Sequence, residues 1–353
     1  MLSRLVPLGV TVVVGLAIAE LGVRLLPSTT LGFDYVDGHF RLPSESEPQT
    51  WRNSLGVHDI EPPRERGNRE RVLLLGDSAV EALAVPIDQG LARRLAHHLE
   101  QQAPGRYDVV SLSRGGWGQG EELAALARHA NALDPDLVLL LFSPRTDPYN
   151  NARELAGREE NLRQIRELRR APRGWSRSFT SEEAVGFWLP FSALNRLLAH
   201  RLTVRALRPA DPVPLQFLAF SPERESMWTG SWRETEQLLL QLRREAGRAG
   251  AGFAVASGST PEGVMEPAAG AARLRAAHPE LGGIDFDVDL PDRRVASICA
   301  GNGVPFRALQ PELRSLERTS GPLHWRYDAH WNVAGNDAAG RLLAEFVIED
   351  SRR

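Results

Sequence analysis

Residues 71–78 read Arg-Val-Leu-Leu-Leu-Gly-Asp-Ser, and this stretch decides the fold class. A continuous apolar run of strand length is typical of a strand that is buried on both faces of a parallel sheet. The run stops at Gly76 and leads directly to Asp77 and Ser78. Because ligands collect at the carboxyl ends of parallel strands, we expect Ser78 to lie at a functional edge of the sheet.

Strand-like and helix-like segments alternate on both sides of this stretch. Such alternation predicts an α/β domain with right-handed crossovers and a mainly parallel sheet. We expect further strands at 107–112, 136–142, 252–256 and 304–309, and helices at 88–102, 119–132, 231–248, 291–301 and 333–348. We interpret 257–290 as a loop, and 172–227 as an insertion over the active-site face that contains a helix at 190–207.

Polar residues follow the other predicted strands as well. The second strand ends in a glycine-rich segment, Ser113 to Gly120, and the third ends in Ser143 to Asn151. Near the C-terminus the chain reads Tyr-Asp-Ala-His-Trp-Asn at 327–332. Ester cleavage by a serine requires a base and a carboxylate that orients the base, and the chain offers one candidate for each role.

These blocks, in this order, resemble the SGNH/GDSL hydrolase superfamily of serine esterases and acyl-transfer proteins. The resemblance covers roughly 70–151 and 225–349, and it implies a three-layer α/β/α, flavodoxin-like fold. It implies Ser78 as nucleophile, His330 as base and Asp328 as the triad acid. It also implies an oxyanion hole formed by the N–H groups of Ser78 and Gly116 and by Thr146, with Asn150 as an alternative donor. Further candidates for substrate contact are Asp77, Trp117, Asp147, Asn150 and Trp331.

Two positions depart from the usual pattern of the superfamily. Thr146 stands where an asparagine amide usually donates to the oxyanion, so we expect weakened catalysis. Asp328 lies two residues before His330 instead of three, and Trp331 follows. This Asp-x-His-Trp pattern is similar to that of the members that attach or remove acetyl groups on bacterial exopolysaccharides.

The N-terminus carries a candidate membrane segment. Arg4 precedes residues 5–19, which contain no charged side chain, and apolar residues continue to Leu26. A full span needs about 20 apolar residues, so we expect a signal anchor over 1–26, with Glu20 and Arg24 near the outer interface and a linker over 27–70. The alternative is a signal peptide cleaved near Ala19, since Ala17-Ile18-Ala19 offers a cleavage site. With Arg4 inside, both alternatives place the domain at 71–353 outside the cytoplasm.

Composition limits the remaining function classes. The chain has 353 residues, 42% of them hydrophobic and 25% charged, which is ordinary for a globular domain. A formal net charge of -3 gives no basic field for nucleic acid. The single cysteine, Cys299, allows no intrachain disulfide and is expected to be a small buried hydrophobe. No histidine pair has metal-ligand spacing, so we predict neither a metal nor a cofactor.

We therefore expect an extracytoplasmic serine esterase that acts on O-acyl, and specifically O-acetyl, esters of a carbohydrate. Two alternatives share the candidate residues. One is a polysaccharide O-acetyltransferase that uses the same acyl-enzyme, together with a membrane acyl-donor protein. The other is a catalytically weakened glycan-binding or assembly protein. The expected partners are an acylated carbohydrate and, through the N-terminal helix, the bacterial inner membrane.

Overall fold

The structure is a computed structural model that describes residues 11, 14–22, 34–36, 39–41, 51–63, 67–155, 215–277, 283–325 and 329–352. The chain forms two compact units. The smaller unit comprises Met1–Ser46 and Glu167–Pro212, and the larger comprises Glu47–Arg166 and Val213–Arg353. The larger unit contains the predicted parallel sheet and every described residue that the sequence proposed for the site.

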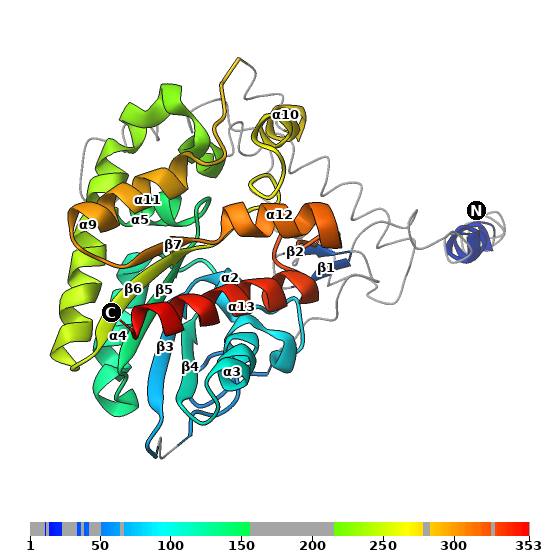
Figure 1. Cartoon of the computed structure of the whole chain (residues 1–353). Helices are drawn as coiled ribbons and strands as arrows, with labels where there is room; N and C mark the ends of the chain where they lie inside the picture. The colour runs from blue at the N-terminus through cyan, green and yellow to red at the C-terminus, as the bar shows by residue number, and fades with distance from the viewer. Residues whose placement is uncertain are drawn as a thin grey trace, which may run out of the picture. The chain divides into compact units, whose positions relative to one another are not determined.

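A five-stranded, all-parallel sheet forms the centre of the larger unit (Figure 1). Its strand order is β4-β3-β5-β6-β7. Numbered along the chain within this sheet, the order is 2-1-3-4-5, which is the order of flavodoxin-like folds. The strands are β3 Glu70–Gly76, β4 Tyr107–Ser113, β5 Leu137–Phe142, β6 Gly252–Ser257 and β7 Phe306–Ala308.

Helices cover both faces of the sheet and produce three layers. Side chains alternate along β3, so that Val72 and Leu74 contribute to one buried cluster while Leu73 and Leu75 contribute to the other. The first cluster also takes side chains from α3 Leu91–Gln102, α12 Gln310–Ser320 and α13 Val333–Asp350. The second takes them from α4 Gln119–Leu133, α9 Glu225–Arg248, α10 Pro267–Ala277 and α11 Leu290–Gly301. The predicted α/β class and parallel sheet are therefore confirmed.

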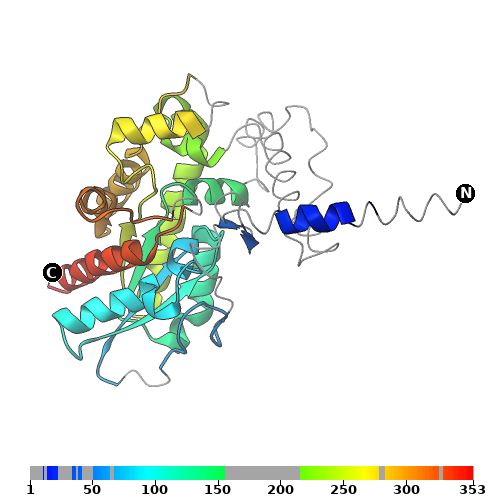
Figure 2. The same ribbon diagram turned by 90° about the vertical axis from the view of Figure 1, so that its right-hand side faces the viewer.

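Helices α3 and α13 lie side by side on one face, as the cyan and red ribbons show in Figures 1 and 2. Gly340 makes this approach possible, because a Cβ atom there would lie 2.7 Å from Arg94 Cβ and 2.9 Å from backbone atoms of α3. Asp337 of α13 also accepts hydrogen bonds from Arg94 Nε at 2.7 Å and His98 Nε2 at 2.9 Å. The last helix is thereby fixed against α3, the long helix between the first two strands of the sheet along the chain.

Several elements differ from the sequence expectations. The expected loop at 257–290 contains α10, where six alanines supply helix propensity without a clear apolar stripe. Helix α12 was not predicted, and α9 begins at Glu225, ahead of the expected start at 231. Strands β1 Asp34–Val36 and β2 His39–Arg41 pair within the expected linker, and α5 Asp147–Leu155 follows β5. The helix expected at 190–207 lies outside the described residues.

Residues 14–22 are helical. Within the described part of the chain, no helix is both long enough and apolar enough to cross a membrane, so the predicted transmembrane helix is not found there. Cys299 is buried on α11, as predicted, and burial raises the pKa of its thiol to about 12.

Candidate active site

Ser78 begins α2 Ser78–Glu81, directly after the strand that the sequence singled out. Gly76 permits this tight exit, because a Cβ atom there would collide with the side chain of Val80. Asp77 caps α2, and its Oδ1 accepts a hydrogen bond from the Ala79 N–H at 2.9 Å. The exit therefore holds Ser78 at the carboxyl edge of the sheet.

His330 approaches Ser78 from a loop near the C-terminus. Its Nε2 lies 2.9 Å from Ser78 Oγ, which is hydrogen-bonding distance. An antiparallel bridge between His324 and Trp331 holds the loop, and the Trp325 N–H donates to the His330 carbonyl at 2.8 Å. The preceding Ala329 has φ 66°, a left-handed conformation that non-glycine residues seldom adopt. The local fold thus orients this imidazole in spite of some backbone strain.

Asp328, the predicted triad acid, lies outside the described residues. Its role stays a prediction from the sequence.

Thr146 lies beside Asp77 and donates to it. Its Oγ1 is 2.8 Å from Asp77 Oδ2, and the hydroxyl of Ser143 donates to Asp77 Oδ1 at 2.7 Å. Asp77 is buried, so these hydrogen bonds compensate its desolvated charge. In this structure the Thr146 hydroxyl donates its proton to the Asp77 carboxylate. Its role in the oxyanion hole stays a prediction.

The glycine-rich loop after β4 is tied to α2. The Gly115 N–H donates to Glu81 Oε2 at 2.7 Å, and the other oxygen of Glu81 pairs with Arg52 Nη2 at 3.0 Å. Gly116 is exposed with φ 79°, a conformation for which glycine carries no steric cost. The loop thus reaches the Ser78 helix through Glu81, and the oxyanion role of Gly116 remains a prediction.

Two buried carboxyl groups lie behind the third strand exit. Gln119 Nε2 donates to Asp147 Oδ2 at 2.6 Å and to Glu122 Oε2 at 3.3 Å. Asp147 also accepts from the Ser143 N–H at 2.8 Å. Burial and neighbouring carboxylates raise the pKa of both acids well above their ordinary values. Asp147 is fully buried and supports the strand exit from behind. In this structure it exposes no atom to solvent with which to make the predicted contact with substrate.

Asn150 and Trp117 are joined to each other. Asn150 Nδ2 donates to the Trp117 carbonyl at 2.8 Å. Asn150 is buried and Trp117 is half-buried. This contact fastens α5 to the glycine-rich loop.

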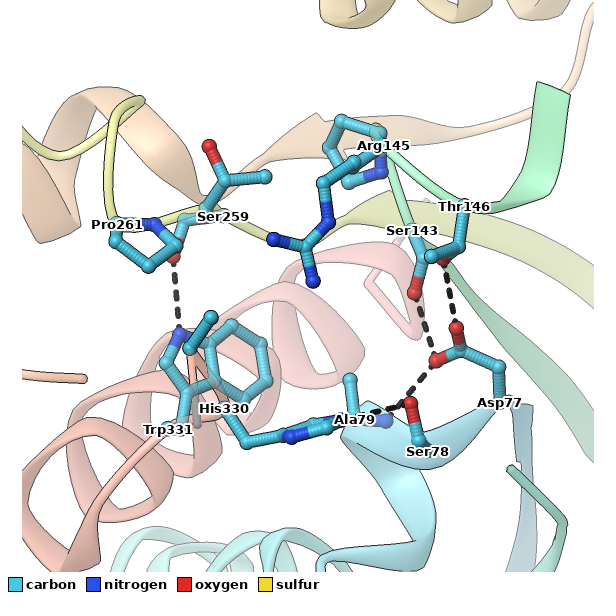
Figure 3. Close-up of a pocket in the computed structure, with 13 residues that line it drawn as sticks. Asp77, Ser78, Ala79, Ser143, Arg145, Thr146, Ser259, Pro261, His330 and Trp331 are labelled. Carbon is cyan, nitrogen blue, oxygen red and sulfur yellow. Dashed lines mark hydrogen bonds between the residues drawn. The ribbon is translucent and has the colours of Figure 1, made fainter. Parts of the chain in front are cut away.

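A cavity of about 50 Å³ opens above Ser78 and His330 (Figure 3). Trp331 forms part of its wall and donates from Nε1 to Ser259 Oγ at 2.9 Å. His324 lies behind this wall, where burial lowers its pKa to about 3 and keeps it neutral. The cavity is lined by Asp77, Ser78, Ala79, Ser143, Pro144, Arg145, Thr146, Ser259, Thr260, Pro261, Ala329, His330 and Trp331.

Sequence reasoning did not assign site roles to Arg145 or to the segment Ser259–Pro261. The second group follows β6, and a search of every strand exit at the carboxyl edge would have found it. Within the ranges that the structure describes, no group of three or more His, Cys, Asp or Glu side chains could hold a metal ion. The arrangement suits a serine hydroxyl whose proton passes to an imidazole.

Comparison with protein-family models finds no match, and no curated protein matches the sequence. Solved structures similar to this chain include an acetylxylan esterase from Geobacillus stearothermophilus, with 15% identity and a TM-score of 0.44, covering 80% of this chain and 95% of that one. A psychrotrophic esterase from Pseudoalteromonas sp. has 10% identity and a TM-score of 0.42, covering 80% and 100%. A GDSL-like lipase from Bacteroides thetaiotaomicron has 12% identity and a TM-score of 0.37, covering 80% and 89%.

Proposed function

We propose that this protein is a serine esterase of the SGNH/GDSL type that cleaves O-acyl esters. The observation that carries the proposal is the 2.9 Å contact between His330 Nε2 and Ser78 Oγ at the carboxyl edge of a parallel sheet. A serine hydroxyl is a weak nucleophile by itself, and an imidazole at this distance can accept its proton.

The proposed reaction proceeds through an acyl-enzyme. Ser78 Oγ attacks the acyl carbon while His330 accepts the hydroxyl proton. His330 then gives this proton to the leaving alcohol, and a water molecule releases the acid by the reverse sequence. Asp328 is proposed to orient the imidazole, and the N–H groups of Ser78 and Gly116 are proposed to stabilise the oxyanion.

The proposed substrate is an O-acetyl ester of a carbohydrate. Support comes from the Asp-x-His-Trp pattern at 328–331, which is similar to that of proteins that handle acetyl groups on exopolysaccharides. Transfer of the acetyl group to a sugar hydroxyl would use the same acyl-enzyme and differs only in the acceptor.

Hydrolysis of a chromogenic acetyl ester tests the proposed activity. The full-length chain is expected to hydrolyse para-nitrophenyl acetate, and Ser78→Ala is expected to abolish turnover. Ser315→Ala, at an exposed serine on α12, is the matched control and should keep the wild-type rate. A Ser78→Ala variant that retains near wild-type turnover would refute the proposal. Formation of an acetylated sugar in place of free acetate would reassign the enzyme as a transferase.

We further propose that the catalytic unit works outside the cytoplasm. The support is Arg4 followed by residues 5–19 without a charged side chain. A periplasm-active reporter fused after residue 60 should be active, and a cytoplasm-active reporter fused there should be silent. The reverse pattern would reject this location. Membrane retention after a carbonate wash distinguishes an anchor from a cleaved signal peptide.

A further inference from the structure

Arg145 extends its guanidinium group into the cavity that contains Ser78 and His330. Figure 3 shows this side chain between the Ser259–Pro261 segment and the Ser143–Thr146 exit, directed toward the catalytic pair. Its Nε is buried without a hydrogen-bond partner, and Cζ lies 5.6 Å from the centre of the Phe217 ring. Among the described residues, no carboxylate forms an ion pair with it. Within the described part of the chain, this cation is held by packing without a counter-charge.

The other charged groups of the cavity do not compensate Arg145. Of the described residues that line the cavity, only Asp77, Arg145 and His330 can carry a charge. Asp77 is 2% exposed, and its two oxygens already accept from Ser143, Thr146 and the Ala79 N–H. Arg145 is half-buried, and desolvating its Nε without a partner is costly, so this arrangement favours binding of an anion.

The cavity lies on the imidazole side of Ser78. Ala329, His330 and Trp331 line it, whereas no residue of the glycine-rich loop at 113–120 does. In ester cleavage the imidazole protonates the leaving alcohol, so the alcohol half of the ester must lie near His330. Arg145 therefore faces the alcohol half of the substrate.

We propose that Arg145 binds an anionic group, specifically a carboxylate, on the alcohol half of the ester. The planar guanidinium matches a carboxylate through two parallel hydrogen bonds. The substrate class is then the acyl esters of acidic hydroxy compounds, such as sugars that carry a carboxylate. This inference rests on the proposed esterase function and narrows its substrate.

Two esters that differ only in charge test the inference. Meta-acetoxybenzoate carries a carboxylate on its alcohol half, and meta-acetoxybenzamide replaces this group by a neutral amide of similar shape. The wild-type protein is expected to prefer the carboxylate ester by about 10- to 100-fold in kcat/KM, the size of one charge-assisted contact. Arg145→Met is expected to reduce this preference at least about 10-fold, whereas Arg145→Lys should retain part of it.

Arg128→Met provides the matched control, because it removes the same charge from an exposed position on α4 and should leave the preference unchanged. Circular dichroism establishes that each variant is folded. A wild-type protein that hydrolyses both esters equally overturns the inference and leaves the esterase function intact. An equal loss on both esters in Arg145→Met also overturns it, since that result indicates a role at the reacting carbonyl. Failure of the wild type to hydrolyse either ester overturns the proposed function and this inference with it.

A second pair of esters tests which half carries the anion. Para-nitrophenyl hemisuccinate places a carboxylate on the acyl half, and para-nitrophenyl butyrate is its neutral counterpart. We expect no Arg145-dependent preference between these two. An Arg145-dependent preference for the hemisuccinate would overturn the assignment to the alcohol half.

Discussion

The Asp77 carboxylate links the exit of β3, where Ser78 lies, to the exit of β5. Thr146→Val removes the donor to Asp77 Oδ2 while nearly preserving the volume of the side chain. A buried carboxylate oxygen without its partner costs about 1–3 kcal/mol, so we expect the free energy of unfolding to fall by this amount. Because Asp77 also caps α2 beside Ser78, kcat should fall as well. Urea unfolding and para-nitrophenyl acetate kinetics measure the two effects.

Thr146→Ser separates the hydroxyl from the methyl group. We expect this variant to keep most of the stability and turnover because it keeps the donor. If Thr146→Val behaves like the wild type in both measurements, the hydrogen bond to Asp77 has no energetic importance, and the oxyanion role predicted from the sequence regains priority.

Ser78 and His330 are expected to act as one catalytic unit. Each alanine variant alone should remove nearly all acetyl-ester hydrolysis, and the double variant should be no slower than the slower single variant, since a nucleophile without its base is already disabled. Steady-state kinetics of the two single variants and the double variant test this. Additive losses would show that His330 contributes independently of Ser78.

At the scale of elements, the contact between α3 and α13 depends on a single missing side chain. Gly340→Ala places a methyl group 2.7 Å from Arg94 Cβ, so the helices must separate or shift. Overpacking of this kind typically costs about 1–3 kcal/mol, which should lower the thermal midpoint by several degrees. Gly301→Ala, at a helix position with open space, is the control and should not lower the midpoint. Equal midpoints for Gly340→Ala and the wild type would show that α3 and α13 accommodate the methyl group without loss of stability.

The sequence predicted some elements better than others, for physical reasons. Strands β3 and β5 contain the continuous apolar runs 72–76 and 137–142, whereas a surface helix alternates apolar and polar residues with a helical period. Helix α12 is amphipathic, but its apolar side is narrow and consists of Leu313 and Leu316 among polar and charged residues. Residue propensity and hydrophobic periodicity therefore predict deeply buried elements more readily than surface helices with a narrow apolar side.

The same distinction applies to the candidate site. Ser78 and His330 could be proposed from local patterns, and the fold brings them within hydrogen-bonding distance. The bond from Thr146 to Asp77 and the position of Arg145 depend on how two strand exits meet, which a single sequence does not specify. Residue identities thus predicted the candidate chemistry, whereas tertiary packing determined which side chains contact one another.

For the whole molecule, the parallel arrangement brings segments that are distant in sequence to one edge. The exits of β3, β5 and β6 and the loop before α13 all contribute to the cavity. Gln119 and Glu122, at the start of α4, extend this edge inward through Asp147. The buried polar network couples the site to the stability of the larger unit.

The buried acids predict how the stability of the molecule depends on pH. Burial, together with neighbouring carboxylates, raises the pKa of Glu122 and Asp147 in the folded state. Above an unfolded pKa of about 4, the folded state therefore binds more protons than the unfolded state. The stability from the neutral acids is fully present below that pH and is lost as the pH rises through the folded pKa values. We therefore expect the free energy of unfolding to decrease from mildly acidic to alkaline pH.

Glu122→Gln tests this origin of the pH dependence, because it keeps the shape of the side chain and removes one titrating group. The variant should be more stable than the wild type at pH about 8 by about 1 kcal/mol, and no more stable at pH about 4, where the wild-type carboxyl is already neutral. Urea unfolding at both pH values measures the difference. The buried Asp292, whose pKa burial raises to about 7, is present in both proteins, so its contribution cancels in the comparison. Glu223→Gln, at an exposed glutamate before α9, should leave the wild-type profile unchanged. A Glu122→Gln profile that runs parallel to the wild type would show that Glu122 is not held neutral by its burial.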